Sequence, residues 1–292
     1  DGTPYVLRKP NYTIIDKQFG ELSDIKMSPR VGQQVIGLGL IDAITRESIE
    51  ANIDIGDSNN DGIIGKANYI IDELSGELKI GKFGWKANQP TLRQQVADAF
   101  NGDMGLSTSI FSEQNCPDSQ TLCNESQIGG EPEVTNSQLN DVIFYQSALA
   151  VPKRRNFMDQ DVLEGKVLFR EADCIKCHAT NFTTGDSSEN NYVEGVLIHP
   201  FSDFLLHDMG QDLADYRSDY LANGSEWRTQ PLWGIGLIST VNNHTNFLHD
   251  GRARNIEEAI LWHGGEADKS KIKFMNLNAI DRNKLIEYVN SL

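Results

Sequence analysis

Residues 174–178 read Cys-Ile-Lys-Cys-His, and this short stretch is the strongest indication of the fold and cofactor of the protein. A Cys-x-x-Cys-His run is typical of a covalently attached c-type haem, in which two thiols bind the vinyl groups and the histidine binds the iron. With 4 Cys and 6 His among 292 residues, the chance of this arrangement is on the order of one in a thousand. We therefore predict one haem c, bound by Cys174, Cys177 and His178.

Two other chemistries use closely spaced cysteines. A Cys-x-x-Cys pair also suits a tetrahedral zinc site or a thioredoxin-like dithiol. A zinc site needs a second pair of ligands at similar spacing, but Cys116 and Cys123 lie far upstream with residues 117–122 between them. Haem therefore ranks first, zinc second and dithiol exchange third.

The segment Cys116-Pro-Asp-Ser-Gln-Thr-Leu-Cys123 is rich in turn-forming residues. We interpret it as a loop closed by a Cys116–Cys123 disulfide, as in proteins that fold in an oxidising compartment. Such a short loop constrains the unfolded chain by only ~2.5 kcal/mol. The alternative is a pair of free thiols in a reducing compartment. Together with the haem motif, the segment predicts a periplasmic or otherwise exported protein.

Length and composition indicate a globular protein of one large or two ordinary domains, with 39% hydrophobic residues. The balance of 26 basic against 42 acidic residues gives a net charge of −16, which repels nucleic acid and anionic lipid alike. The sequence holds no run of about 18 apolar residues, so we expect no membrane span. It opens at Asp1 without a signal peptide yet resembles the middle of a folded domain, which predicts a processed or truncated product.

Hydrophobic periodicity divides the chain near residue 150. Residues 1–150 are rich in Gly, Asn and Asp, with two expected helices, one at 92–100 and one from 136 or 137 to Pro152. Residues 151–292 are expected to be mainly helical. We predict a mainly α fold, with a cytochrome c-like helical haem domain in the C-terminal half and an irregular region of helices and short strands before it.

Two helices are expected to flank the haem. One begins at a cap at Asp159 or Asp161 and leads directly into Cys174, and the other begins near Asp281 and runs to the end of the chain. Helices in these places can cross and bury one edge of a porphyrin. Their apolar positions are Leu163, Val167, Leu285, Val289 and Leu292.

The iron needs a second axial ligand, and helical geometry separates the candidates. Residues 254–265 predict a helix with Asn255 as its cap, Glu258 completing a capping box, and glycines at its end. On this helix His263 shares an apolar face with Ile260. A histidine on such a face is more often a core residue than a ligand, and here the two interpretations have equal weight. The other candidates are His199, His207, Met209, His244 and His249.

Longer stretches carry a resemblance to a known family. They are Trp-Arg-Thr-Gln-Pro-Leu-Trp-Gly-Ile-Gly-Leu at 227–237, Phe-Leu-His-Asp-Gly-Arg-Ala-Arg at 247–254, and Glu-Glu-Ala-Ile-Leu-Trp-His-Gly-Gly-Glu-Ala at 257–267. With these motifs the chain resembles the bacterial di-haem oxidoreductases, often labelled thiol oxidoreductases. That family is similar to the bacterial cytochrome c peroxidases and to the di-haem enzymes of methylamine utilisation. Further matching stretches, which extend the resemblance over nearly the whole chain, lie at 1–5, 7–10, 36–40, 83–86, 100–105 and 205–210.

The resemblance implies His178 as the proximal and His263 as the distal ligand of the iron. At the position of His263, peroxidases carry a distal Met and the methylamine enzymes a Tyr. Two imidazoles lower the reduction potential relative to a Met/His pair, so this departure argues against a high-potential haem. Met209 is the second choice for the distal ligand. Arg228 becomes a candidate partner of a haem propionate, against the alternative of an ordinary surface arginine.

The family also implies a first haem on a domain that precedes Asp1. The sequence contains no second Cys-x-x-Cys-His, so the chain is expected to hold the electron-relay half of a two-haem enzyme. We assign no catalytic residue.

Residues 57–65 indicate a possible second site. Oxygen side chains at positions one, three and five, Gly at six and a backbone carbonyl at seven follow the pattern of a calcium loop. Position twelve is an Asn where a bidentate Glu is typical, so bound calcium and a simple Asp- and Asn-rich turn have equal weight. The candidate calcium ligands are Asp57, Asn59, Asp61, Ile63 and Asn68.

Three functions are compatible with the sequence. The first is an exported c-type haem oxidoreductase that exchanges electrons with a redox partner protein or a small-molecule oxidant, as part of a peroxidase-like di-haem enzyme. It is an enzyme only if the first-haem domain is present. The second is a non-catalytic electron carrier or haem-binding module. The third is a calcium-stabilised interaction protein without haem.

Overall fold

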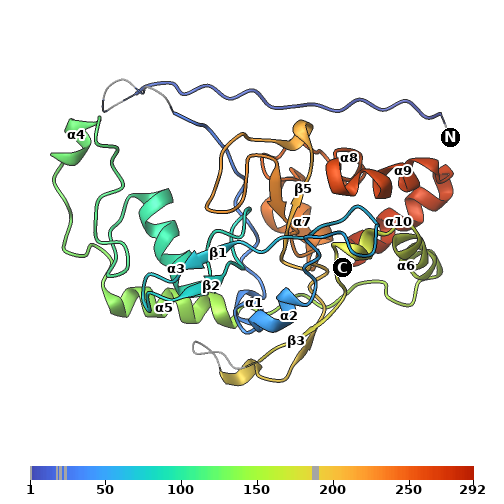
Figure 1. Ribbon diagram of the computed structural model, residues 1–292, viewed down its shortest axis with the longest axis horizontal. Coiled ribbons are helices and arrows are strands. Elements are labelled where there is room, and N and C mark those ends of the chain that lie inside the picture. Colours follow the sequence, from blue (N-terminus) through green and yellow to red (C-terminus); the bar gives the residue numbers. More distant parts are fainter. Residues whose placement is uncertain (1, 18, 20–21, 23–24, 186–190) are drawn as a thin grey trace.

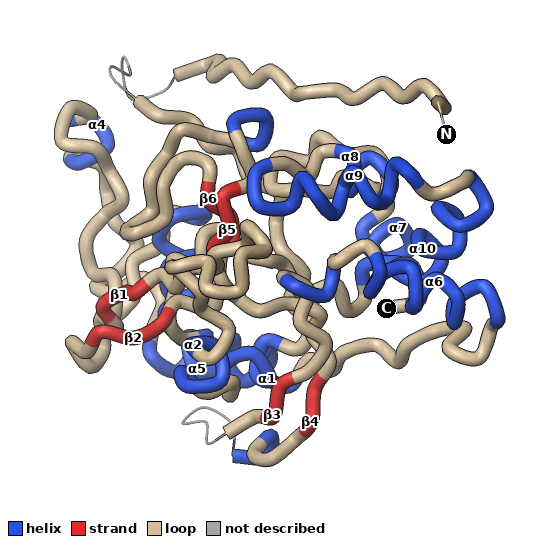
Figure 2. The backbone as a smooth tube through the Cα atoms, turned by 45° about the vertical axis from the view of Figure 1, so that its right-hand side comes forward, coloured by secondary structure: helices blue, strands red, loops and turns tan. Residues whose placement is uncertain are grey.

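The computed structural model describes the chain except for residues 1, 18, 20–21, 23–24 and 186–190. Helices and short strands are joined by long irregular segments (Figures 1 and 2). The expected mainly α fold is therefore confirmed only in part, because short strands also occur in the C-terminal half. The helices are α1 (Leu38–Asp42), α2 (Arg46–Glu50), α3 (Leu92–Asp98), α4 (Thr121–Asn124), α5 (Asn136–Ala148), α6 (Gln160–Glu171), α7 (Ile238–Asn242), α8 (Ile256–Leu261), α9 (Asp268–Asn276) and α10 (Ala279–Ser291). The strands are β1 (Tyr69–Ile71), β2 (Leu78–Ile80), β3 (Phe182–Thr183), β4 (Leu197–Ile198), β5 (Leu206–Asp208) and β6 (Glu226–Arg228).

The strands of the described residues pair as three antiparallel two-stranded sheets, β1 with β2, β3 with β4, and β5 with β6. The third sheet matters most for the site. In it Leu206 faces Arg228, and His207 faces Trp227. Because neighbouring residues of a strand point to opposite faces, this small sheet presents several polar side chains to its surroundings in fixed directions.

Most of the buried apolar residues that the structure describes form two large cores. One lies around α1, α3 and α5 and also takes in Phe182, Phe204 and Trp233 from later in the chain. The other lies among α6, α8, α9 and α10, which gather at one end of the molecule (right in Figure 1). Packing therefore crosses residue 150, and a division into two domains at that point stays a prediction.

Helices α6 and α10 cross closely. Helix α6 begins where the Asp159 carboxylate accepts the backbone N–H of Asp161 at 2.9 Å, which confirms the expected cap. At the crossing, the Lys284 carbonyl of α10 occupies the space that a larger residue at position 165 would need, so glycine is the residue that fits there. Helix α10 starts at Ala279 with Asn278 as its cap, slightly before the expected start near Asp281.

The helix expected over residues 254–265 is shorter than predicted. Asn255 caps it, since the Glu258 N–H donates to its Oδ1 at 2.8 Å. The Glu258 carboxylate does not complete the expected capping box with Asn255, because it accepts from the Arg254 N–H at 2.8 Å. Helix α8 ends at Leu261, so His263 lies beyond it and not on its face.

The N-terminal segment runs extended along one side of the molecule (Figures 1 and 2). Hydrogen bonds tie it to a loop near the end of the chain; among them, Arg8 Nε donates to the Arg252 carbonyl at 3.2 Å, and the Tyr12 hydroxyl donates to the Asp250 carbonyl at 2.8 Å. Helices of the described part are all too short or too polar to cross a bilayer.

Candidate functional site

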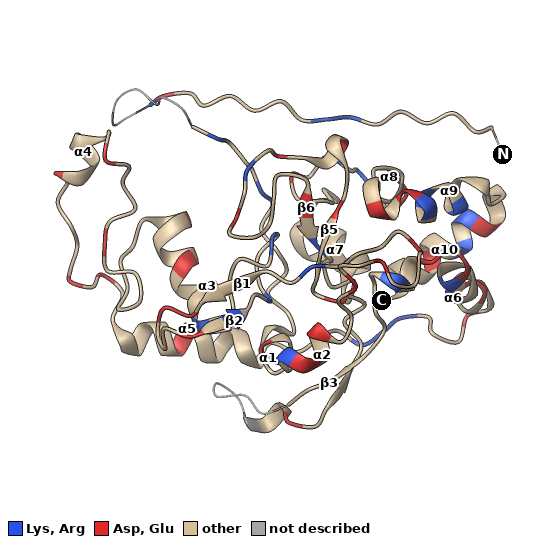
Figure 3. Ribbon diagram, viewed as in Figure 1, with Lys and Arg blue, Asp and Glu red and all other residues tan. Residues whose placement is uncertain are grey.

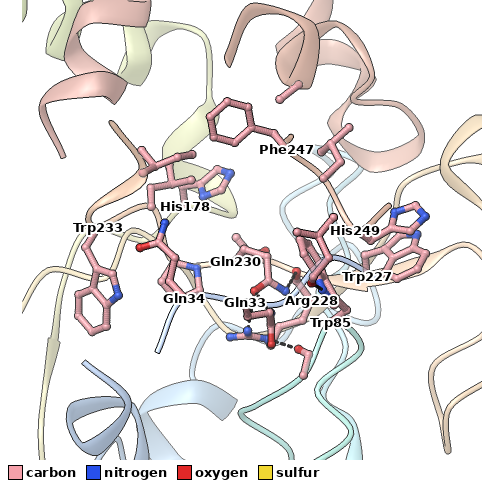
Figure 4. Close-up of a pocket in the computed structure, with 18 of the residues that line it drawn as sticks. Gln33, Gln34, Trp85, His178, Trp227, Arg228, Gln230, Trp233, Phe247 and His249 are labelled. Carbon is pink, nitrogen blue, oxygen red and sulfur yellow. Dashed lines mark hydrogen bonds between the residues drawn. The ribbon is translucent and has the colours of Figure 1, made fainter. Parts of the chain in front are cut away.

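A cavity of about 640 Å³ reaches from the α6–α10 end of the molecule toward the β5–β6 sheet. This volume falls in the range of about 300–1,000 Å³ that is typical of cofactor and ligand sites. Figure 4 shows His178 at one end of the cavity and Trp227, Arg228 and His249 at the other. The apolar part of its wall near His178 includes Phe169, Ile256, Ile260, Leu285 and Val289.

The Cys-Ile-Lys-Cys-His run folds into a compact turn directly after α6. Asp173 adopts a left-handed conformation with φ of 62°, residues Cys174–Lys176 form one 3-10 turn, and the His178 N–H donates to the Cys174 carbonyl at 2.9 Å. This turn brings Cys174, Cys177 and His178 to the same cavity. The two thiols are not joined to each other.

Desolvation raises the pKa of the Cys174 thiol to about 12 and also raises the pKa of Cys177. Both thiols are therefore protonated at neutral pH. Because thiol–disulfide exchange needs a thiolate, this environment disfavours the dithiol alternative.

The two predicted axial ligands, His178 and His263, have matching environments. The His178 Nδ1 donates to the Phe201 carbonyl at 2.9 Å, and the His263 Nδ1 donates to the Ala259 carbonyl at 2.7 Å. A carbonyl oxygen only accepts, so each ring carries its proton on Nδ1 and leaves the Nε2 lone pair available. This is the tautomer in which histidine binds metals, with the second nitrogen held by a hydrogen bond.

Desolvation lowers the pKa of His178 to about 4, and the nearby His263 contributes to the lowering. Desolvation likewise lowers the pKa of His263. Both rings are therefore neutral at neutral pH, as ligation requires.

The position of His263 follows from how α8 ends. In a continuing helix the Ala259 carbonyl would accept the backbone N–H of His263. Here it accepts the imidazole instead, and the backbone N–H of His263 donates to the Ile260 carbonyl at 3.0 Å. The histidine thus closes the helix with its own side chain, and the same hydrogen bond fixes the direction of its Nε2.

Arg228 is a buried cation with one hydrogen-bond donor that no described residue engages. It is 5% exposed, its Nε donates to the Gly84 carbonyl at 2.8 Å, and its Nη2 donates to the Gln230 Oε1 at 2.7 Å. Its Nη1 lines up with no acceptor among the residues that the structure describes. Desolvation lowers the pKa of Arg228 to about 9. The alternative of an ordinary surface arginine is therefore wrong. A carboxylate in the cavity would satisfy the remaining donor.

The structure also distinguishes among the other candidates for the second axial ligand of the iron. Both ring nitrogens of His207 are bonded to carboxylates, so His207 has no lone pair to offer. His199 is exposed and bonded to the Thr180 carbonyl. His249 stacks on Trp227, with ring centroids 3.8 Å apart. Met209 lines the same cavity as His263.

The predicted calcium loop is a tight turn whose side chains bind its own backbone. Asp57 accepts the Gly62 N–H at 3.0 Å, and Asn59 accepts the Asp61 N–H at 2.9 Å. Asp61 in turn accepts the Ile63 N–H at 2.8 Å. Calcium binding here stays a prediction.

Asn68 is held away from that role. Its amide donates to the carbonyls of Lys86 and Asp219, and its Oδ1 accepts the Leu221 N–H at 3.0 Å. All the hydrogen-bonding groups of its side chain are therefore engaged outside the loop. The structure therefore does not bring Asn68, the twelfth position of the pattern, together with the other four candidate calcium ligands.

Cys116 and Cys123 are joined by a disulfide, with Cα atoms 5.8 Å apart. The structure thus contains the expected pair. The loop includes the start of α4, which lies at one edge of the molecule (upper left in Figure 1).

Sequence reasoning missed a cluster next to the cavity. His207 bridges Asp203 and Glu266, and its Nδ1 lies 3.8 Å from the Cys177 Sγ. Asp203 and His207 are four residues apart, but Glu266 lies 59 residues further on. No local spacing could have predicted that contact.

Comparison with known proteins gave three findings. A family model described as "Di-haem oxidoreductase, putative peroxidase" matches residues 16–292. No curated protein matches the chain. Among solved structures, hydrazine synthase of Kuenenia stuttgartiensis, pressurised with 20 bar xenon, is similar at 16% identity and a TM-score of 0.40, over 97% of this chain and 100% of that chain. A similarity of this strength carries no argument about function.

Proposed function

The chain belongs to the di-haem oxidoreductase family, and we propose that it binds one haem c covalently and moves single electrons through it. The observation that best supports this proposal is the matched pair of neutral histidines, each with Nδ1 on a carbonyl and Nε2 left available at one cavity. Two unpaired thiols lie in the same turn as one of them.

Each residue of the proposed site has one role. Cys174 and Cys177 form the thioethers, His178 is the proximal ligand and His263 the distal ligand. Met209 remains the second choice for the distal position. The Nη1 of Arg228 donates to a propionate, which gives this buried N–H group an acceptor that the described residues do not provide. When bound, the haem supplies a one-electron couple between ferrous and ferric iron.

The surrounding residues explain why the site suits electron transfer. The apolar wall excludes water, and fixed imidazoles need little rearrangement when the charge of the iron changes. Two neutral imidazole ligands place the potential below that of a His/Met haem. This part of the chain forms a cytochrome c-like haem domain within residues 151–292, preceded by a first domain within residues 1–150.

The proposed role is an electron relay and not the site of substrate chemistry. The sequence contains no second Cys-x-x-Cys-His, and we assign no catalytic residue. Peroxidase-type turnover belongs to this chain only together with a first-haem region. The electrons come from, or go to, a redox partner protein or a small-molecule oxidant in the periplasm or another exported compartment.

A haemochrome spectrum tests the proposal directly. The protein is produced together with the cytochrome c maturation machinery, and its intact mass is measured beside the spectrum. We expect one covalently bound haem and a low-spin spectrum that His178→Ala abolishes. Protein that leaves the maturation machinery without haem would refute the proposal. Peroxide turnover by the haem-loaded chain alone would instead refute the restriction to electron relay, whereas reversible reduction without turnover agrees with it.

A further inference from the structure

Arg228 is held in place by neutral groups. Its Nε donates to the Gly84 carbonyl, its Nη2 donates to the Gln230 Oε1, and its own carbonyl accepts the Gln230 Nε2 at 3.3 Å. Among the residues that the structure describes, no carboxylate forms an ion pair with this side chain. Asp203 is the acid whose charge acts on Arg228, but its carboxylate bonds His207 at 2.8 Å. Buried arginines are usually paired, so this uncompensated charge needs an explanation.

Two glutamines fix the direction of the guanidinium group. That group has donors only, so the amide oxygen of Gln230 has to face Arg228. The Gln33 Nε2 donates to the same oxygen, which therefore accepts two hydrogen bonds. Gln33 precedes α1 and Gln230 follows β6, and both line the cavity beside Arg228 (Figure 4). Because Nε and Nη2 are engaged, Nη1 is the nitrogen left without an acceptor.

Resting on the proposed function, we infer that Gln230 and Gln33 are positioning residues that hold Arg228 by neutral groups alone and so keep its charge for a ligand that carries a carboxylate. Gln230 holds the guanidinium group, and Gln33 holds the amide of Gln230. The pair links the segment before α1 to the end of β6, so two distant parts of the chain set the direction of one donor.

The choice of an amide at position 230 determines what the cavity selects. A glutamate there would have nearly the same shape and would form an ion pair with Arg228, which would neutralise the cation. The amide holds the guanidinium group and leaves its charge in place. Water screens charges weakly at a buried position, so this charge attracts an anionic group strongly. A neutral ester of the same ligand gains no such attraction, and the cavity should therefore prefer the carboxylate.

Reversible binding of a haem analogue tests the inference. Iron mesoporphyrin has ethyl groups in place of vinyl groups, so it forms no thioethers with Cys174 and Cys177. Its dimethyl ester has the same ring without the carboxylates. The haem-free chain is titrated with each form, and binding is followed by the Soret absorption band. The parent protein should bind the free acid roughly 10- to 100-fold more tightly than the ester, as expected for a hydrogen bond between charged groups.

The ratio of the two affinities is the decisive quantity, because a variant that only loosens the fold weakens the binding of both forms alike. Gln230→Glu should bring the ratio close to one, since the new carboxylate pairs with Arg228 and repels a second carboxylate. Gln33→Leu should lower the ratio by less, because Gln230 still contacts the guanidinium group. The matched control is Gln211→Glu, which adds the same charge at an exposed position and should leave the ratio unchanged.

Each outcome has one meaning. If Gln230→Glu keeps the ratio of the parent protein, the inference is wrong. If the parent does not distinguish acid from ester, the inference is also wrong, while the proposed binding of haem stands. If neither form binds and maturation attaches no haem, the proposed function fails and the inference with it.

Haem-loaded protein provides a second measurement for a Gln230→Glu chain that does not fold without haem. The propionate bending band in the resonance Raman spectrum reports hydrogen bonds to the propionates. We expect Gln230→Glu and Arg228→Met to shift this band and Gln211→Glu to leave it in place. The same band position in the parent and in Gln230→Glu would refute the inference.

Discussion

Replacing Gly165 with Ala tests the helix crossing on which the proposed haem-binding turn depends. A Cβ atom at this position would lie 1.9 Å from the Lys284 carbonyl oxygen and 2.9 Å from the Tyr288 Cβ. A flexible side chain could rotate away from such a contact. The carbonyl belongs to the backbone of α10, so one helix has to move.

The expected cost follows from two opposing effects. Overpacking of a core costs about 1–3 kcal/mol, whereas Ala gains up to about 1 kcal/mol over Gly inside a helix. Contact with the backbone belongs at the upper end of the overpacking range, so we expect a net loss of about 2 kcal/mol in the free energy of unfolding. Because α6 leads directly into the Cys174–Lys176 turn, the yield of attached haem should fall as well.

Urea denaturation followed by far-ultraviolet circular dichroism measures this loss. The control is Gly102→Ala, where an added Cβ would meet nothing within 4 Å, and this variant should be at least as stable as the parent protein. A Gly165→Ala protein that unfolds at the same or a higher urea concentration than the parent would show that the crossing is looser than described.

Three further outcomes are expected. In haem-loaded protein, His263→Ala should open the iron to carbon monoxide and Met209→Ala should not; the reverse result would make Met209 the distal ligand. In haem-free protein, the free energy of unfolding should fall as the pH drops from about 6.5 toward 4, because the unfolded chain protonates His178 while the folded chain, with its pKa of about 4, does not. His178→Gln should flatten that dependence in urea titrations, and an equal slope in both proteins would contradict the assignment. Chelation should lower the melting temperature if calcium occupies the 57–65 loop, Asp57→Asn should remove the difference, and no effect on the parent protein would remove the site.

Local sequence predicted those parts of the structure that depend on hydrogen bonds between residues close together in the chain. The Asp159 cap depends on hydrogen bonds to the next two or three residues, so the start of α6 was correct. Helix α5 also begins where expected, at Asn136, because Thr135 and Gln138 form a capping box.

The incorrect expectations have non-local or competing causes. The helix at 254–265 was expected to continue to the glycines, but the imidazole of His263 competes for the Ala259 carbonyl and ends it early. For Arg228 the sequence left burial and exposure open, and its hydrogen bond to Gly84, 144 residues away, has no local signal. Periodicity describes one helix at a time, so it predicts neither a side chain that replaces a backbone donor nor a partner from another segment.

The 57–65 loop is joined to the proposed haem site by side chains of opposite charge. Asp61 forms an ion pair with Lys176 of the attachment motif at 3.2 Å, and its carbonyl accepts from Lys269 of α9 at 2.7 Å. Figure 3 shows such acidic and basic positions interspersed at this end of the molecule. A calcium ion in the loop would need the Asp61 carboxylate that Lys176 now contacts. Calcium and Lys176 therefore compete for one group, so occupation of the loop would change the charge beside the haem-binding turn even though the loop contributes no ligand to the iron.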